Sequence, residues 1–190
     1  MVVTPLDSKR VIKFPTGISV PKEIAMKNTI KGYEELKRLK IPVTERMPNM
    51  VINGREGLVF ERARPITPKE VRKFAGKLKK YVRIAAKNGV YWDSALGNVG
   101  IVEKERKLPL LSLFNIKLPP KKKFKIIDTN EVYKTGKGGW IMLAPGENPR
   151  KAAEFWMLVK TSEALEGEKN PNLKRARKTF EKRIRRVAKD

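Results

Sequence analysis

Short apolar runs and turn residues alternate along the first sixty positions. Residues 1–16 read VVTPL, the turn letters DSK and then RVIKF, which predicts a β-hairpin ending at Pro15. Two further runs, MVIN and GLVFE, are joined by Asn53 and Gly54, the dipeptide best suited to a tight hairpin turn. The pattern therefore predicts two hairpins in this part of the chain.

A helical segment separates the two hairpins. Ser19 and Pro21 open it, and it runs to about Leu39 before Pro42 stops it. Its apolar residues recur at spacings of four, three and three, as expected for one buried helix face. These residues are Met26, Ile30, Tyr33 and Leu36.

A longer helix is predicted from Thr67, which forms a capping box with Glu70 and has Pro68 at the first helical position. Gly89 ends it. The expected buried face comprises Val71, Phe74, Leu78, Tyr81 and Ala85. The runs GVYW, VGIV and FKII then predict three short strands. A basic insertion, residues 104–123, separates the last two and is either a strand extension or a partner-binding loop.

Two more helices are predicted to follow Asn148-Pro149 and Asn170-Pro171. The buried positions expected in the first are Ala152, Phe155, Trp156 and Val159. Those expected in the second are Leu173, Ala176, Phe180, Ile184 and Val187, with Lys and Arg filling the other faces. Trp92 and Trp140 are expected in the core.

Charge is the most unusual feature of the composition. The 190 residues include 44 Lys and Arg but only 20 Asp and Glu, a net charge of +24. This charge attracts phosphate-rich or acidic partners, although a lysine-rich surface of the thermophile type is the alternative.

The residue types that are missing exclude much chemistry. The chain has no cysteine and no histidine, which removes disulfides, thiol nucleophiles, Ser-His hydrolases and histidine- or cysteine-bound metals. Carboxylates, lysines, hydroxyls and oxygen-bound metals remain. No signal-peptide pattern and no long apolar run is present, so we expect a soluble cytoplasmic protein without a membrane partner.

Aspartate is scarce, and two of the four aspartates follow apolar strands. Asp93 ends VYWD and Asp128 ends KIID, where an uncompensated carboxylate would be costly to bury. Asn98 lies five residues after Asp93, directly before the run VGIV. Carboxylate and amide oxygens at the ends of neighbouring strands suit Mg²⁺. The alternative is that Asp93 and Asn98 only cap a turn and that Asp128 only pairs with a lysine.

The order of these elements resembles the protein-kinase-like fold over nearly the whole chain, and most closely the RIO-type and aminoglycoside-phosphotransferase-type kinases. The resemblance implies an α+β, two-lobed fold: a truncated N-lobe (residues 1–62) with a small antiparallel sheet and one helix, and a mostly helical C-lobe (residues 63–190). It implies Asp93 as the catalytic residue, Asn98 and Asp128 as the metal ligands, and ATP and Mg²⁺ as cofactors. The usual histidine before the catalytic aspartate is Tyr91, and the DFG position reads Asp128-Thr129-Asn130.

The N-terminal part matches this family less clearly. Residues 1–12 contain no glycine-rich loop. Lys13 is the preferred phosphate-binding lysine, and Lys27, inside the predicted helix, is the alternative. The resemblance implies a hinge at Glu61–Ala63 that meets adenine, with Phe60 guarding the pocket. The ion-pair partner of the lysine would be Glu23, Glu34 or Glu35, although the family spacing places Gly32 there.

Three functions follow as hypotheses. The first is ATP- and Mg²⁺-dependent phosphoryl transfer to Ser or Thr of an acidic or nucleic-acid-associated protein, because a cationic small substrate would be repelled. The second is a catalytically inactive kinase-like protein that binds nucleic acid or a ribonucleoprotein through its basic surface. The third is a metal-dependent nuclease that uses Asp93 with Glu105, Arg106 and Lys107.

Overall fold

Helices and antiparallel strands make up an α+β fold, as the sequence predicts. The computed structural model describes residues 1–16, 20–104, 120–129, 132–134 and 148–188. The helices in these ranges are α1 (Lys22–Arg38), α2 (Pro68–Lys87), α4 (Pro149–Glu163) and α5 (Pro171–Val187). The strands are β1 (Val2–Pro5), β2 (Arg10–Phe14), β3 (Met50–Ile52), β4 (Arg55–Glu61), β5 (Arg64–Pro65), β6 (Val90–Trp92), β7 (Val99–Lys104), β8 (Lys121–Ile126) and β9 (Val132–Lys134).

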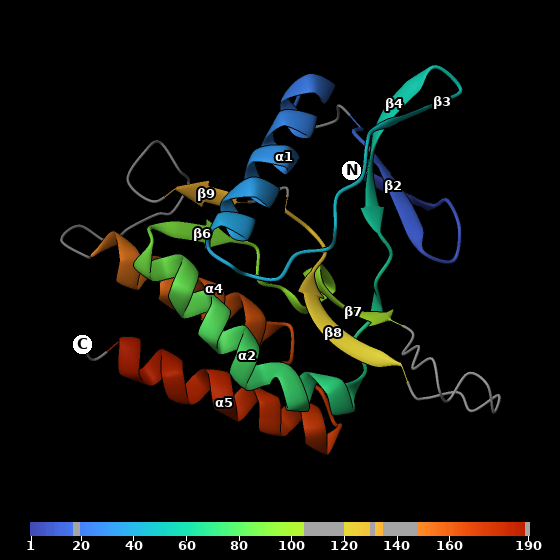
Figure 1. Ribbon diagram of the computed structural model, residues 1–190. Helices are drawn as coiled ribbons and strands as arrows, with labels where there is room; N and C mark the ends of the chain where they lie inside the picture. Colours follow the sequence, from blue (N-terminus) through green and yellow to red (C-terminus); the bar gives the residue numbers. More distant parts are fainter. Residues whose placement is uncertain (17–19, 105–119, 130–131, 135–147, 189–190) are drawn as a thin grey trace, which may run out of the picture.

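The strands form three small sheets. The first has the order β1-β2-β4-β3, the second β5-β7-β8 and the third β6-β9. In Figure 1 the four-stranded sheet and α1 lie in the upper half, and α2, α4 and α5 lie together in the lower half. Strands β7 and β8 lie between these two parts. Asp93 follows β6, Asn98 precedes β7 and Asp128 follows β8. These strand ends lie near the middle of the molecule.

Both predicted hairpins are present. Strands β1 and β2 pair with Val2 opposite Phe14, and β3 pairs with β4 so that Ile52 faces Arg55. Asn53 and Gly54 between them have φ angles of 50° and 71°. These angles match the turn that needs two left-handed residues, which explains the dipeptide found there.

The predicted capping box starts α2. The Thr67 side chain accepts a hydrogen bond from the Glu70 backbone, and the Glu70 carboxylate accepts one from the Thr67 backbone at 3.1 Å. Arg64 also donates two hydrogen bonds to Glu70, at 2.8 and 2.6 Å. These guanidinium contacts, more than any other cause, hold the pKa of Glu70 well below its usual value. Glu70 therefore ties β5 to the beginning of α2.

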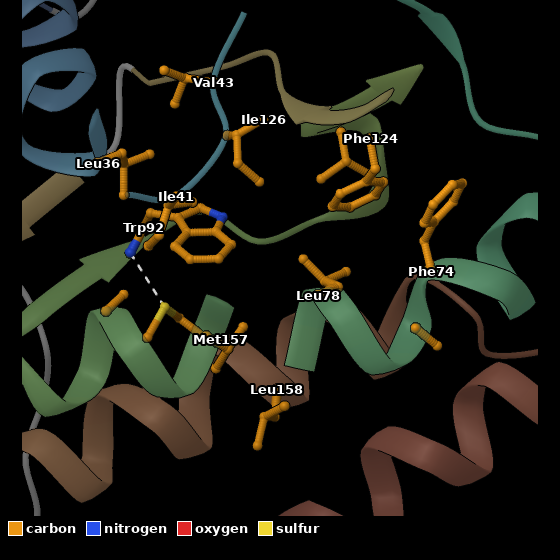
Figure 2. Packing of buried hydrophobic residues seen from close by; sticks show 14 of the residues in the cluster. Leu36, Ile41, Val43, Phe74, Leu78, Trp92, Phe124, Ile126, Met157 and Leu158 are labelled. Atoms are coloured by element: carbon orange, nitrogen blue, oxygen red, sulfur yellow. Dashed lines mark hydrogen bonds between the residues drawn. The ribbon is translucent and has the colours of Figure 1, made fainter. Parts of the chain in front are cut away.

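The core lies where the strand ends meet the helices (Figure 2). Trp92, at the end of β6, is completely buried, and its backbone N–H donates a 3.4 Å hydrogen bond to the Met157 sulfur of α4. Leu78 and Phe74 of α2 approach Phe124 of β8 from below, and the Phe74 and Phe124 rings stack with centroids 5.3 Å apart. The predictions for Trp92 and for most of the α2 face are confirmed, with Tyr81 only partly buried.

The C-terminal end of α1 is closed by a left-handed residue. The Lys40 N–H bonds to the Lys37 carbonyl at 2.9 Å, and the Ile41 N–H bonds to the Leu36 carbonyl at 3.0 Å. This pair of bonds defines a Schellman motif, in which the left-handed position is usually glycine. Lys40 takes that position with φ of 56°. A lysine there costs backbone energy, on the order of 1 kcal/mol.

The predicted face of α4 was wrong in part. Ala152 is buried as expected, but Trp156 is 45% exposed, and Met157 and Leu158 are the fully buried large residues. Residues 152–159 are apolar almost all round the helix, so the sequence pattern could not define a single face. Contact with α2, α5 and β6 selects the buried side. The predicted face of α5 is confirmed, except that Ile184 is only half-buried.

Some predictions fall outside the described residues. These are the start of α1 at Ser19, the insertion between 105 and 119, Asn130 and Trp140. Within the ranges that the structure describes, no helix combines the length and apolarity needed to cross a bilayer.

Candidate active site

Lys13 of β2 meets Asp128, which lies two residues after the end of β8. The Lys13 side chain, on β2, is only 6% exposed, and its Nζ donates to the Ile127 carbonyl at 2.7 Å. Nζ also lies 3.4 Å from Asp128 Oδ1. Burial lowers the pKa of the Lys13 ammonium, and the charge of Asp128 opposes this shift. A buried lysine that is held by one long ion pair is the kind of group that is expected at functional sites.

Of the predicted nucleotide-facing residues, Phe60 lies beside Lys13. Lys13 Nζ lies 5.3 Å from the centre of the Phe60 ring, which is itself buried. The Glu61 side chain pairs with Lys125 of β8. Ala63 packs against Gly100 of β7, where a Cβ would come within 2.8 Å of the Ala63 Cβ. The segment from Phe60 to Ala63 is thus fixed between the first and second sheets.

The loop from Asp93 to Asn98 joins β6 to β7 and closes on itself. The Ala95 N–H donates to Asp93 Oδ1 at 3.1 Å, and Asn98 Nδ2 donates to the Asp93 backbone carbonyl at 3.1 Å. These are the turn-capping bonds that the alternative interpretation predicts. They leave the Asn98 side-chain oxygen as the atom that could bind a metal ion.

Backbone bonds bring this loop to the segment that precedes Asp128. Val99 pairs with Ile126 in the β7–β8 ladder, and the Ile127 N–H donates to the Asn98 carbonyl at 2.9 Å. Asn98 is therefore hydrogen-bonded to the residue that precedes Asp128. The structure brings Lys13 and Asp128 into direct contact and joins Asn98 to the segment before Asp128. Asp93 is linked to Asn98 by the hydrogen bond from Asn98 Nδ2.

Sequence reasoning missed the contribution of α4. Lys160 Nζ lies 3.1 Å from Asp93 Oδ1, and the Lys160 side chain is 41% exposed. Ser94 is completely buried, and its hydroxyl donates to the Met157 carbonyl, with the Thr161 hydroxyl 3.0 Å from the Ser94 carbonyl. Helix α4 therefore holds the Asp93 loop and supplies a cation to it. No signal in the sequence indicated this contact, because the predicted buried face of α4 did not include Met157.

The alternatives on α1 lie elsewhere. Lys27 and the predicted ion-pair candidates Glu23 and Glu34 are exposed, while Glu35 pairs with Arg38 and with Lys134. None of the three glutamates contacts Lys13 in the structure, where Asp128 is the carboxylate paired with it.

Gly32, the position that the family spacing gives for an ion-pair partner, lies against the chain just after Asp128. An added Cβ would lie 2.1 Å from the Thr129 carbonyl oxygen and 3.0 Å from Val132. The Thr129 hydroxyl donates to the Thr29 carbonyl of α1 at 3.0 Å. Because the helix approaches the backbone so closely, no side chain fits there.

The oxygen donors fit a magnesium ion carried by a nucleotide better than a metal held by protein alone. In the part of the chain that the structure describes, no three acidic side chains gather as a metal-binding group. Asp128 and the Asn98 side-chain oxygen are one carboxylate and one amide, which suits Mg²⁺ when phosphate and water supply the remaining ligands. The nuclease candidates Glu105, Arg106 and Lys107 lie outside the described residues.

A pocket opens beside the predicted hinge. Its volume is about 370 Å³, and Ala63, Leu96, Gly97 and Ile127 line one part of it. These residues come from the hinge segment, from the Asp93 loop and from the position before Asp128. The lining is mainly apolar and the volume lies within the range of small-ligand sites.

Comparison of the sequence with models of protein families and with curated proteins finds no match. The candidate function therefore rests on the geometry of the site.

Proposed function

We propose that this chain is a small ATP- and Mg²⁺-dependent phosphotransferase with a protein-kinase-like, two-lobed arrangement, and that it phosphorylates a Ser or Thr hydroxyl of a protein. The observation that carries the proposal is the ion pair between the buried Lys13 of β2 and Asp128, which lies two residues after the end of β8 in another sheet. The loop that contains Asp93 and Asn98 lies beside it, linked by the hydrogen bond from Ile127 to Asn98.

Each residue has a role in this proposal. Lys13 binds phosphate oxygens of ATP, for which a lysine serves as a point charge. Asp128 and Asn98 would hold Mg²⁺, which when bound supplies positive charge to the phosphates. Asp93 orients the acceptor hydroxyl and accepts its proton as the new bond from oxygen to the γ-phosphorus forms. The bond from that phosphorus to the oxygen of ADP breaks in the same transfer.

The surroundings support these roles. The pocket next to Ala63 and Ile127 is apolar, as a nucleobase requires, and it is continuous with the residue before Asp128. A basic surface is unfavourable for cationic substrates and attracts acidic ones. An acidic protein, or a protein bound to nucleic acid, is therefore the proposed acceptor.

A thermal shift experiment tests ATP binding and the choice of lysine. ATP with Mg²⁺ at about 100 times its Kd stabilises a folded protein by about 2.7 kcal/mol. For a chain of this length that corresponds to a rise in Tm of roughly 5–10 °C. Lys13→Met should lose this rise, whereas the matched variant Lys27→Met, altered on the exposed face of α1, should keep it.

The readout is the difference in Tm with and without nucleotide, because removing a buried charge can itself change the melting point of Lys13→Met. A normal ATP-induced rise in Lys13→Met would contradict the assignment of Lys13. The absence of any rise in the wild type would contradict the proposed function.

Lys160 offers a second test, of transfer rather than binding. Its ammonium lies beside the proposed catalytic aspartate and is partly exposed, so it can neutralise the phosphate that is being transferred. We expect Lys160→Met to lower kcat by roughly 10–100-fold, with a smaller change in the KM for ATP.

Lys160→Arg should restore much of this loss, and Arg150→Met, which removes an exposed charge from the first turn of α4, should change little. An unchanged kcat in Lys160→Met would remove this residue from the mechanism.

A further inference from the structure

A lysine-lined groove lies between α1, α2 and β8. It has a volume of about 560 Å³, and its floor includes the segment from Ile41 to Val43 and Phe124. Seven lysines and no arginine are among its lining residues. Lys122 and Lys125 form ion pairs with glutamates. The other five form no ion pair within 4 Å with the carboxylates that the structure describes: Lys37, Lys40, Lys77, Lys121 and Lys123. Glu45 also lines the groove, and its pKa is lowered by the hydrogen bond from Lys104 and, to a smaller extent, by the charge of Lys123.

Two of these ammonium groups are supported by aromatic rings instead of carboxylates. Lys37 Nζ lies 5.4 Å from the centre of the Tyr33 ring, and Lys77 Nζ lies 5.4 Å from that of Phe74. Such contacts hold a cation in place without neutralising it. The groove therefore keeps seven lysines close together against one carboxylate among the described lining residues, Glu45, and this excess of positive charge favours the entry of an anion.

Lys40 adds a separate reason to regard the groove as a binding site. It occupies the left-handed position of the Schellman motif, where glycine would remove the backbone strain. Glycine would also remove from the groove one of the five lysine charges that form no ion pair within 4 Å. Backbone strain at a residue that lines a pocket suggests a functional role for that residue, and this hypothesis can be tested directly.

The chemistry of the groove favours phosphate over carboxylate. Paired recognition of a carboxylate by two parallel hydrogen bonds is the role of arginine, whereas lysine acts as a point charge and suits phosphates. Tyr81, a partly exposed lining residue, stacks on Phe124 with ring centroids 6.3 Å apart. Single-stranded nucleic-acid sites combine a basic groove with an aromatic platform on which an unpaired base can stack.

We propose that this groove binds the phosphate backbone of single-stranded nucleic acid. The groove is lined from α1, α2 and β8, and the residues proposed for phosphoryl transfer lie on β2, the Asp93 loop, α4 and, for Asp128, the segment that follows β8. Asp128 does not itself line the groove, so RNA binding and phosphoryl transfer can be tested separately. The groove also differs from the basic outer faces of α5, which would be the expected binding site if charge alone decided it.

The probe is a fluorescein-labelled single-stranded RNA of mixed sequence, about 12 nucleotides long, and the readout is fluorescence anisotropy. The groove variant carries Lys77→Gln, Lys121→Gln and Lys123→Gln. The control variant removes the same number of charges from α5, as Lys174→Gln, Lys178→Gln and Lys182→Gln, all at exposed positions. Both variants have a net charge lower by three.

We expect the groove variant to bind RNA at least tenfold more weakly, and the control to change by less than about threefold. The slope of log affinity against log salt should fall by about 2 in the groove variant, because three phosphate contacts are lost. Equal losses in both variants would show that only net charge attracts RNA, and would overturn the assignment to this groove.

Lys40→Gly separates binding from folding, because the two effects have opposite signs. The variant should melt about 2–4 °C higher, since the left-handed strain is relieved, and should bind the RNA more weakly by about threefold. Unchanged affinity would count against the site. Polyglutamate and unlabelled RNA of equal charge are then compared as competitors of the labelled RNA. If both compete equally well, the groove binds any polyanion, and the assignment to nucleic acid is overturned.

The ATP-induced rise in Tm should be the same in the groove variant and in the wild type. Failure of RNA binding would therefore leave the proposed phosphotransferase untouched, and failure of ATP binding would leave the groove untouched.

Discussion

Replacing Asp128 by asparagine should abolish phosphoryl transfer. The substitution keeps the size of the side chain but removes the carboxylate that would hold Mg²⁺ next to Lys13. Metal and phosphate contacts of this kind contribute several kcal/mol to the transition state, which corresponds to roughly a 10³-fold loss of rate. The measurement is transfer of label from γ-labelled ATP to the chain or to an added acidic protein substrate.

The structure shows why this variant needs a partner experiment. In Asp128→Asn, the buried ammonium of Lys13 would keep only neutral acceptors, the Ile127 carbonyl and the new amide oxygen, and would lose its negatively charged partner. Breaking a buried pair on one side can cost about 3 kcal/mol or more of stability. The double variant with Lys13→Met removes both charges and should regain stability while staying inactive, so that inactivity cannot be assigned to unfolding.

A matched aspartate provides the control. Asp7 also pairs with a cation, Arg10, but it lies exposed in the turn between β1 and β2. Asp7→Asn should therefore retain activity within about twofold, because exposed pairs contribute little. Transfer by Asp128→Asn at the wild-type rate would refute the assignment of this residue.

Replacing Gly32 by alanine should strongly destabilise the fold. The new Cβ would meet the Thr129 backbone oxygen at 2.1 Å, a contact that a change of rotamer cannot relieve. Overpacking of this kind costs about 3 kcal/mol, which lowers Tm by roughly 6–12 °C. Because Thr129 follows Asp128 directly, we also expect the ATP-induced rise in Tm to shrink.

Gly76 is the matched control within a helix. It lies on the exposed side of α2, and an added Cβ would meet nothing within 4 Å. Gly76→Ala should therefore stabilise the protein by about 1 kcal/mol through helix propensity. Equal stability changes in the two variants would show that α1 does not pack against the Thr129 backbone as the structure has it. Chemical denaturation with constant m-values is the appropriate measurement.

Local signals predicted much of the fold. The capping box of Thr67 and Glu70 and the turn at Asn53 and Gly54 act through bonds within a few residues, so the sequence alone determines them. The spacing of apolar residues on α5 also suffices to predict its buried face, because charged residues occupy the outer side of the helix. On α4 no run of charged residues marks the outer side, which is why Trp156 was assigned to the buried side. The two-residue strand β5 and the three-residue strand β9 carry too little pattern to be detected.

The candidate site was predicted in its residues but not in its contacts. Asp93, Asn98 and Asp128 stood out because aspartate is rare here and follows apolar strands. The choice between Lys13 and Lys27 depends on whether each lysine lies on a strand or on a helix. The periodicity of the apolar residues places Lys13 on a strand and Lys27 on a helix. The contact between Lys160 and Asp93 joins positions 67 residues apart in the sequence. Nothing in the neighbourhood of either residue indicates it, since one lysine among so many carries no distinguishing pattern.

The Asp93 loop and Lys13 are attached to different parts of the fold. Ser94 fastens the loop to Met157 on α4, whereas Lys13 belongs to the four-stranded sheet. A tilt of that sheet relative to the helices would carry the lysine away from Asp128 and leave the loop in register with α4. In the proposed phosphotransferase, admission of a nucleotide and release of its product would then move only the side of the site that carries Lys13, while Asp93, the proposed proton acceptor, stays in place.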